Sequence, residues 1–268
     1  MTLLFAFQTN SHYYMVQEFV NGGELFTLLK KEKRFSDRRV RFYAAEIVLA
    51  LEYMHTNGVC YRDLKPENIL LDKEGHIRLT DFGVSKGMLN VEERGRSESM
   101  VHGTNIYLAP EVYDARNGYG FSIDWFSLGL VIYEMLTGGE HPYKNIAIAE
   151  DASYEIELME IVRTKEVQLP PFFSDSEVDI VQQFLLKDPE KRLGCRGISV
   201  EDGIDEIKDH PFFQGIDWEA LEDLDVKVPF KPKVDHSADI SQIDNSFTNA
   251  SDVYSESGSS QFISYDSY

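Results

Sequence analysis

Three short strings at fixed separations constrain this chain more than its composition does. The strings are Tyr61-Arg-Asp-Leu-Lys-Pro-Glu-Asn68, Asp81-Phe-Gly83 and Ala109-Pro-Glu111. The aspartates of the first two, Asp63 and Asp81, are 18 residues apart. An aspartate taken alone is usually a turn residue or a helix cap. Three such strings in this order are hard to explain as unrelated turns and caps. Together they indicate one catalytic segment.

The residue types in the first two strings suit phosphoryl transfer. A carboxylate such as Asp63 can accept the proton of a substrate hydroxyl, and the cation of Lys65 suits a transferring phosphate. Mg²⁺ prefers oxygen ligands, which Asn68 and Asp81 supply. The step from Asp63 to Asn68 follows the catalytic-loop pattern D-L-K-x-x-N. We therefore predict four catalytic residues, two of them metal ligands (Asn68 and Asp81), with ATP and Mg²⁺ as cofactors.

The net charge of the chain limits the classes of molecule that it is expected to bind. It has 46 Asp and Glu against 26 Lys and Arg, a formal net charge of −20. Nucleic acids and anionic membrane surfaces attract basic proteins, so we expect neither as a partner. A basic peptide fits this charge, and the alternative is that the charge serves only solubility.

The cysteines and the apolar segments indicate a compartment. The two cysteines form no CxxC pair, which favours a reducing environment over a disulfide framework. The first residues lack the basic region of a signal peptide. The most apolar stretch, 125–136, is too short to span a bilayer. We expect a soluble protein of the cytoplasm, the nucleus or both.

Hydrophobic periodicity predicts mostly helices with a few short strands. The polar segment after residue 235 is rich in Ser and Asp and is typical of a flexible tail. We expect strands at 3–7, 13–20, 69–72 and 76–79, and helices at 24–30, 37–57, 122–137, 154–163 and 175–187.

These strings resemble those of the AGC serine/threonine protein kinases. Gly103-Thr104, Lys187-Asp-Pro-Glu-Lys-Arg192-Leu-Gly and Pro229-Phe-Lys-Pro232 add to the resemblance, which covers residues 1–268. GGELFTLL at 22–29 and EIVLALEYMH at 46–55 look most like the mitogen- and stress-activated and ribosomal-protein kinases.

The resemblance implies an α+β, protein-kinase-like fold. The helical large lobe would be the main part, with a remnant hairpin of the small lobe and a C-terminal regulatory tail. It implies three regions: 1–20 as small-lobe remnant and hinge, 21–213 as large lobe, and 214–268 as the AGC-type tail.

The resemblance also implies a nucleotide site. Glu18, Phe19 and Val20 would form the hinge that binds adenine through its backbone. Gln17 would be the gatekeeper before the hinge, and Leu70 would form the floor of the adenine pocket.

For the protein substrate, the resemblance implies an acidic site that reads basic residues. Glu24 would bind the ribose and an arginine three residues upstream of the phosphorylated Ser or Thr. Glu67 and Glu160 would bind a second basic residue, and the alternative for all three is ordinary surface charge. Thr104 would favour Ser and Thr over Tyr as the acceptor.

Other matches are regulatory or structural. Ser99 resembles an activating phosphosite displaced by one residue, which would need an upstream activating kinase. The resemblance implies a buried ion pair between Glu111 and Arg192. It also implies that Asp124 accepts hydrogen bonds from the catalytic-loop backbone.

The residues before the hinge differ from the family pattern. They contain no glycine-rich loop, no lysine-bearing strand and no helix with a partner glutamate. These elements stabilise the transferring phosphates. We therefore expect an N-terminally truncated kinase whose activity as an isolated chain is doubtful. The alternative is a catalytically impaired fragment that acts as a non-catalytic binding or regulatory protein.

Overall fold

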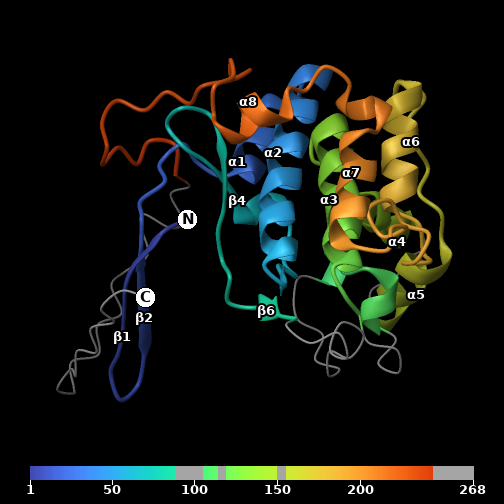
Figure 1. Cartoon of the computed structure of the whole chain (residues 1–268), viewed down its shortest axis with the longest axis horizontal. Coiled ribbons are helices and arrows are strands. Elements are labelled where there is room, and N and C mark those ends of the chain that lie inside the picture. Colours follow the sequence, from blue (N-terminus) through green and yellow to red (C-terminus); the bar gives the residue numbers. More distant parts are fainter. Residues whose placement is uncertain (89–104, 114–118, 150–154, 244–268) are drawn as a thin grey trace.

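The computed structural model describes residues 1–88, 105–113, 119–149 and 155–243. It has an α+β fold in which the helices pack together and an N-terminal hairpin stands to one side of them (Figure 1). The helices are α1 (Leu25–Glu32), α2 (Asp37–Thr56), α3 (Ser122–Thr137), α4 (Pro142–Ala149), α5 (Glu155–Thr164), α6 (Asp175–Phe184), α7 (Val200–Lys208) and α8 (Trp218–Glu222). The strands are β1 (Leu3–Gln8), β2 (Tyr13–Gln17), β3 (Val59–Cys60), β4 (Ile69–Leu71), β5 (Ile77–Leu79) and β6 (Lys86–Gly87).

The N-terminal hairpin is a two-stranded antiparallel sheet of β1 and β2. The backbone N–H of Thr9 closes its turn on the carbonyl of His12 at 2.8 Å. The rings of Phe7 and Tyr14 stack across the strands with centroids 4.7 Å apart. Apolar side chains remain exposed, as in Phe5 and Met15, each 68% exposed. An isolated two-stranded hairpin is only marginally stable in water.

Helix α3 forms the centre of the core because it is apolar on all sides. Every residue from Ile123 to Leu136 is buried, as expected for a helix without a polar face. The Trp125 ring stacks on Phe184 of α6 with centroids 6.3 Å apart. Gly129 lets α3 and α6 approach closely, because a Cβ there would lie 2.7 Å from the Phe184 Cβ.

Two further sheets flank the segment that carries the first two sequence strings. Strand β4 pairs with β5 in an antiparallel hairpin, and β3 pairs with β6. Residues 61–68 lie between β3 and β4 and include a 3₁₀ turn, Pro66–Asn68. The short strands therefore hold both ends of the predicted catalytic loop.

The segment after α8 packs against the start of α2 and the turn between β4 and β5. The Arg39 guanidinium lies 4.5 Å from the centre of the Phe230 ring. Gly75, with φ +97°, meets the backbone there, since a Cβ would lie 2.1 Å from the Phe230 carbonyl oxygen. The amide of Asn21 donates to the carbonyls of His236, at 3.1 Å, and Ser237, at 3.4 Å. The tail is thus joined to the segment that follows β2.

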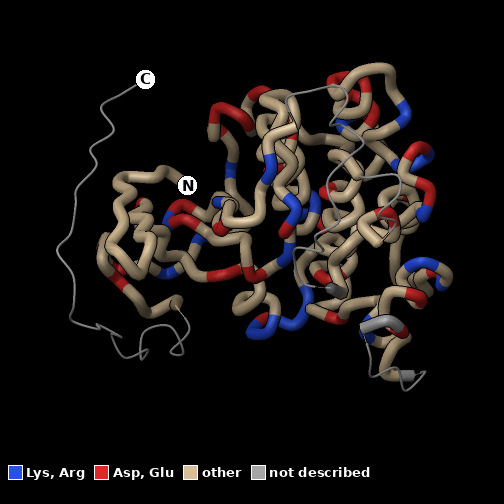
Figure 2. The backbone as a smooth tube through the Cα atoms, turned by 90° about the horizontal axis from the view of Figure 1, so that it is seen from below, with Lys and Arg blue, Asp and Glu red and all other residues tan. Residues whose placement is uncertain are grey.

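Most predicted elements are present, with different ends. The helix expected at 122–137 has those bounds, whereas the strand expected at 13–20 ends at Gln17 and the helix expected at 175–187 ends at Phe184. Helices α4, α7 and α8 were not predicted. Acidic residues occur on every side of the view in Figure 2, with basic residues interspersed.

Candidate active site

Asp124 fixes the backbone of the predicted catalytic loop from below. Its carboxylate accepts hydrogen bonds from the backbone N–H groups of Tyr61 and Arg62, each at 2.8 Å. It also lies 2.8 Å from Nε2 of His55 and is 1% exposed. Arg62 has φ +72°, a conformation that costs energy for a residue with a side chain. The buried carboxylate offsets that cost and holds the turn that precedes Asp63.

The polar ends of Asp63, Lys65 and Asn68 meet at one point. The ammonium of Lys65 donates to both carboxylate oxygens of Asp63, at 3.0 and 2.8 Å. The amide nitrogen of Asn68 donates to Oδ2 of Asp63 at 2.7 Å and to its carbonyl at 2.9 Å. Asp63 is 8% exposed. Its carboxylate is therefore held in one orientation by two donors.

Asp81 is exposed just after β5, the second strand that follows this loop. Its φ is +56°, and its Oδ1 accepts a long hydrogen bond, 3.3 Å, from the N–H of Gly83. The next residue, Phe82, packs edge-on against Tyr61 with centroids 5.5 Å apart. The hydroxyl of Tyr61 donates to the carbonyl of Thr80. The Asp81 carboxylate thus remains available to an incoming ligand.

The donor set fits a Mg²⁺ ion that also binds phosphate. Asn68 uses its amide nitrogen toward Asp63, which leaves the amide oxygen as a ligand, and Asp81 offers a carboxylate. Within the described residues, no group of three or more His, Cys, Asp or Glu side chains is placed to hold a metal ion. Mg²⁺ commonly takes one or two protein oxygens and completes its shell with substrate phosphate and water.

Backbone contacts join the segment that follows the predicted hinge to the strand that contains the predicted adenine floor. The N–H of Gly22 donates to the Leu71 carbonyl, and the N–H of Leu71 donates to the Gly23 carbonyl, both at 2.9 Å. An isolated β-bridge pairs Glu24 with Leu70. The structure therefore brings together Glu24, predicted to bind the ribose, and Leu70, predicted to form the adenine floor.

The hinge residues themselves lie between the hairpin and this bridge. Glu18 is tied to the start of the chain, since its N–H donates to the Thr2 carbonyl and its Oε1 accepts from the Thr2 N–H, both at 2.9 Å. Gln17 ends β2, Phe19 is 54% exposed, and Val20 precedes Asn21.

Glu134 is an acidic residue near Glu67 that sequence reasoning did not assign. Burial raises the pKa of its carboxyl most, and the charge of Glu67 raises it further, whereas the hydrogen bond from Tyr107 lowers it. The resulting pKa is about 8. The Tyr107 hydroxyl donates to both carboxylate oxygens of Glu134, at 2.8 and 3.0 Å. Oε2 of Glu67 is buried without a hydrogen-bond partner in the described structure. The signal in the sequence was a lone carboxylate within the apolar run 125–136.

One other predicted substrate residue is described, and it lies on a different helix. Glu160 is on α5, where its exposed carboxylate lies 3.7 Å from the Arg163 guanidinium. Ser99 and Thr104 fall outside the described residues. The roles of these three residues stay predictions.

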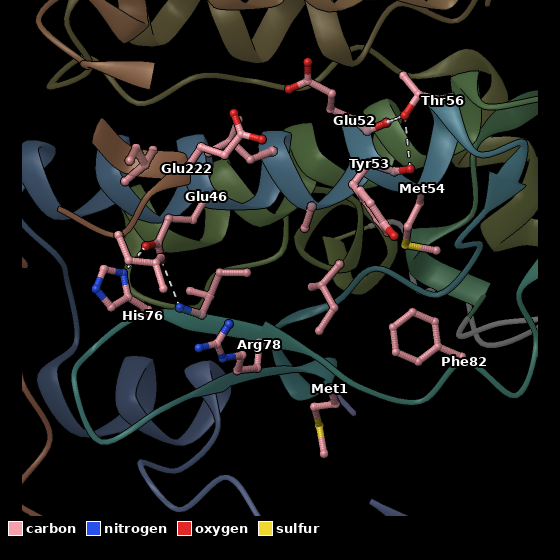
Figure 3. Close-up of a pocket in the computed structure, with 16 residues that line it drawn as sticks. Met1, Glu46, Glu52, Tyr53, Met54, Thr56, His76, Arg78, Phe82 and Glu222 are labelled. Carbon is pink, nitrogen blue, oxygen red and sulfur yellow. Dashed lines mark hydrogen bonds and ion pairs between the residues drawn. The ribbon is translucent and has the colours of Figure 1, made fainter. Parts of the chain in front are cut away.

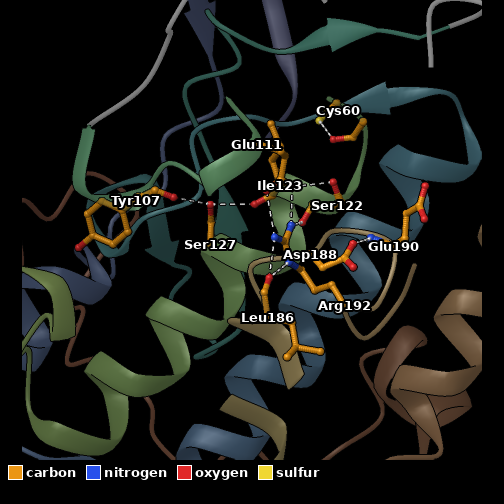
Figure 4. Close-up of polar contacts among 11 residues, drawn as sticks. Cys60, Tyr107, Glu111, Ser122, Ile123, Ser127, Leu186, Asp188, Glu190 and Arg192 are labelled. Carbon is orange, nitrogen blue, oxygen red and sulfur yellow. Dashed lines mark hydrogen bonds and ion pairs between the residues drawn. The ribbon is translucent and has the colours of Figure 1, made fainter. Parts of the chain in front are cut away.

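A buried ion pair joins Glu111 and Arg192 (Figure 4). Arg192 is fully buried and also donates to the carbonyls of Leu186 and Ser122. Glu111 accepts a further hydrogen bond from the Ser122 hydroxyl at 2.8 Å. Each charged group therefore has several partners, which a charge inside a protein requires.

A cavity of about 710 Å³ is lined mainly by residues of α2, β5 and α8 (Figure 3). Phe82 borders it, whereas Asp63, Lys65 and Asn68 do not. Its wall contains a buried pair in which Nδ1 of His76 lies 2.5 Å from Oε1 of Glu46. This cavity is thus distinct from the predicted nucleotide site.

Comparisons with known proteins agree with this geometry. The family model for the protein kinase domain matches residues 1–213. The chain is 45% identical over 249 residues to "Protein kinase 2" of Dictyostelium discoideum, covering 92% of the chain and 48% of that protein. It is 46% identical over 249 residues to the "RAC family serine/threonine-protein kinase homolog" of the same organism, covering 92% and 52%.

A human protein gives a similar result. The chain is 41% identical over 259 residues to "Ribosomal protein S6 kinase alpha-4" of Homo sapiens, covering 97% of the chain and 32% of that protein. The chain thus spans about a third to a half of these relatives. In the described part, no helix has the length and apolar character needed to cross a membrane. The family match and these relatives confirm the predicted α+β kinase fold, and the chain belongs to the protein kinase family, among the AGC kinases.

Proposed function

We propose that this chain is the catalytic part of a serine/threonine protein kinase that transfers the γ-phosphate of ATP to Ser or Thr in arginine-containing sites. The observation that carries the proposal is the cluster of Asp63, Lys65 and Asn68. A carboxylate held by a cation and an amide suits a base that orients a substrate hydroxyl.

Each residue of the cluster has a defined part in that reaction. Asp63 accepts the hydroxyl proton as the oxygen attacks phosphorus. Lys65 neutralises charge on the phosphate oxygens, and Asn68 and Asp81 hold the Mg²⁺ that Mg-ATP brings. The backbone of Glu18 to Val20 would bind adenine.

The preference for basic sites is supported by Glu67 and Glu134. Two carboxylates that share a partly buried location repel each other, which adds to the rise of the Glu134 pKa. A guanidinium between them would remove this repulsion and pair with the buried Oε2 of Glu67, which has no partner in the described structure. Glu24 and the predicted residues Glu160 and Thr104 complete the proposed substrate site.

Phosphate transfer to a peptide with arginine three residues before serine tests the proposal. The readout is the mass of the peptide after incubation with Mg-ATP, with and without an activating kinase that modifies Ser99. Asp63→Asn should lower the rate by about 10²–10⁴-fold. Asp188→Asn is the matched control, because Asp188 is an exposed carboxylate paired with Lys191. No transfer under either condition contradicts the proposal for this chain.

A second candidate is a non-catalytic binding or regulatory protein. It is favoured by the exposed apolar side chains of the N-terminal hairpin, which offer a contact surface to a partner. The transfer assay together with calorimetry of Mg-ATP binding separates the two candidates. The second candidate predicts no transfer with or without nucleotide binding, whereas the first requires both.

A further inference from the structure

Residues 30–41 are strongly basic within an acidic chain. They contain seven Lys and Arg against two acidic residues, a net charge of +5 where the chain as a whole has −20. They span the end of α1, the connection to α2 and its first turns. Five of the basic side chains are exposed, and we name them the basic loop surface: Lys30, Lys31, Lys33, Arg34 and Arg38.

Few internal partners neutralise this surface. Arg34 lies 3.8 Å from Asp37, and both side chains are exposed, so the pair is weak. Within the described residues, the side chains of Lys31, Lys33 and Arg38 make no hydrogen bond or ion pair. Glu32, the other acidic residue of the segment, pairs with the inward Arg39.

The backbone of the surface is held in place. Lys33 ends α1 with φ +66°, and its N–H donates to the Leu29 carbonyl at 2.9 Å. The connection packs against the end of α3, since a Cβ at Gly138 would lie 1.5 Å from the Lys33 carbonyl oxygen. Phe35, 2% exposed, anchors the segment in the core. Binding of a partner would therefore order the long side chains but not the backbone that carries them, which limits the entropy cost of binding.

Aromatic rings accompany the cations. The Arg34 guanidinium lies 4.4 Å from the centre of the Phe172 ring, and Phe172 is 52% exposed. Buried Phe173, with its ring centroid 5.4 Å from that of Phe172, supports it from below. On α1, the Lys30 ammonium lies 4.0 Å from the Phe26 ring. The surface thus presents an apolar contact next to positive charge.

We propose that the basic loop surface docks an acidic polypeptide segment of a partner protein that carries an apolar side chain among its carboxylates. Carboxylates would pair with Arg34 and Arg38, and the apolar side chain would pack on Phe172. Nucleic acid fits less well, because the acidic remainder of the chain repels an extended polyanion. This proposal goes beyond phosphate transfer and does not depend on it.

A pair of charge-reversal variants tests the docking site. The probe is a short fluorescent peptide of Asp and Glu around one Leu, and the readout is fluorescence anisotropy. Lys33→Glu/Arg38→Glu should weaken binding about tenfold or more, as expected for the loss of several exposed charge contacts. Arg163→Glu/Lys191→Glu is the control, because it makes the same charge change on exposed residues outside the surface. Circular dichroism melts establish that both variants fold.

The apolar contact has its own test. Phe172→Ser should weaken binding, while Ile148→Ser, at another exposed apolar residue, should leave binding unchanged. A peptide with Ser in place of Leu should bind more weakly to the unchanged protein. Equal losses in both charge variants, or no binding of the acidic peptide at low salt, overturn the proposal. Tighter binding of a single-stranded oligonucleotide through the same lysine and arginine also overturns it.

Discussion

Arg192 and Glu111 form a two-point ion pair across 81 residues of sequence. Nη1 of Arg192 lies 2.5 Å from Oε1 of Glu111, and Nη2 lies 3.0 Å from Oε2. Arg192 has no exposed surface, and the Glu111 side chain is 9% exposed. The pair joins the segment after α6 to the residues just before α3, below the candidate active site.

Removing one partner of this pair should destabilise the protein strongly. Glu111→Gln leaves a buried guanidinium without its counter-charge, which typically costs about 3–5 kcal/mol. Urea denaturation measures the free energy of unfolding. Arg196 and Glu206 provide the control, since they form a pair at 2.9 Å in which the side chains are 37% and 32% exposed. Glu206→Gln should cost no more than about 1 kcal/mol. Equal costs for the two variants would contradict the assignment.

The free energy of unfolding should fall as pH rises because of Glu134. Its pKa is about 8 in the folded protein against an ordinary 4.5. As pH rises, the unfolded chain loses this proton near pH 4.5, whereas the folded protein keeps it until about pH 8. The stabilisation that Glu134 contributes is therefore complete below pH 4.5 and is lost as pH rises through 8. Glu134→Gln should therefore flatten the pH dependence in this window. Urea titrations across the range measure it.

Tyr107→Phe sharpens the same experiment. The Tyr107 hydroxyl donates to the Glu134 carboxylate and lowers its pKa. Its removal should move the midpoint of the titration to higher pH. A shift to lower pH would show that the hydrogen bond has the opposite effect.

Glu67 and Glu160 should differ in their effect on substrate choice. If the proposed function holds, Glu67→Gln removes a partner of the substrate arginine and lowers kcat/KM for arginine peptides. A hydrogen bond to a charged group is worth about 1.5–3 kcal/mol, roughly a 10- to 150-fold change. Glu160→Gln should have a smaller effect, because that carboxylate is exposed and paired with Arg163. Parallel assays with a neutral peptide show whether the losses are specific to the cation.

Asp124→Asn should loosen the catalytic loop more than it unfolds the protein. The change replaces one acceptor oxygen with an amide nitrogen, so one of the N–H groups of Tyr61 and Arg62 loses its acceptor. Amide hydrogen exchange in the peptide containing both residues should accelerate. Asp72→Asn is the control, since Asp72 accepts the N–H groups of Glu74 and His76 in a different turn. Unchanged exchange at residues 61 and 62 would exclude the positioning role.

Local strings made the centre of the site predictable. Asp63, Lys65 and Asn68 are within six residues of one another, so a tight loop brings their side chains together. Helix α3 was predicted with its full bounds because its apolar run is long and ends at Gly138, which has φ +88°.

Long-range contacts were not predictable in the same way. Glu134 approaches Glu67 from a helix far along the chain, and no local pattern encodes that distance. Helix α7 contains Gly203 and α8 has five residues, so propensity gives a weak signal for both. The contact between Asn21 and His236 spans 215 residues and depends on how the tail packs.

That contact has a mechanical consequence for the hairpin. The hairpin is joined to the helical part through residues 18–24, and Asn21 within this connection is pinned to the tail. Gly22 and Gly23 are pinned to Leu71. Rotation of β1 and β2 relative to the helices is therefore confined to Phe19 and Val20, because Glu18 is itself hydrogen-bonded to Thr2. The tail therefore restrains the connection between the hairpin and the helices, although the two segments are more than 200 residues apart in the sequence.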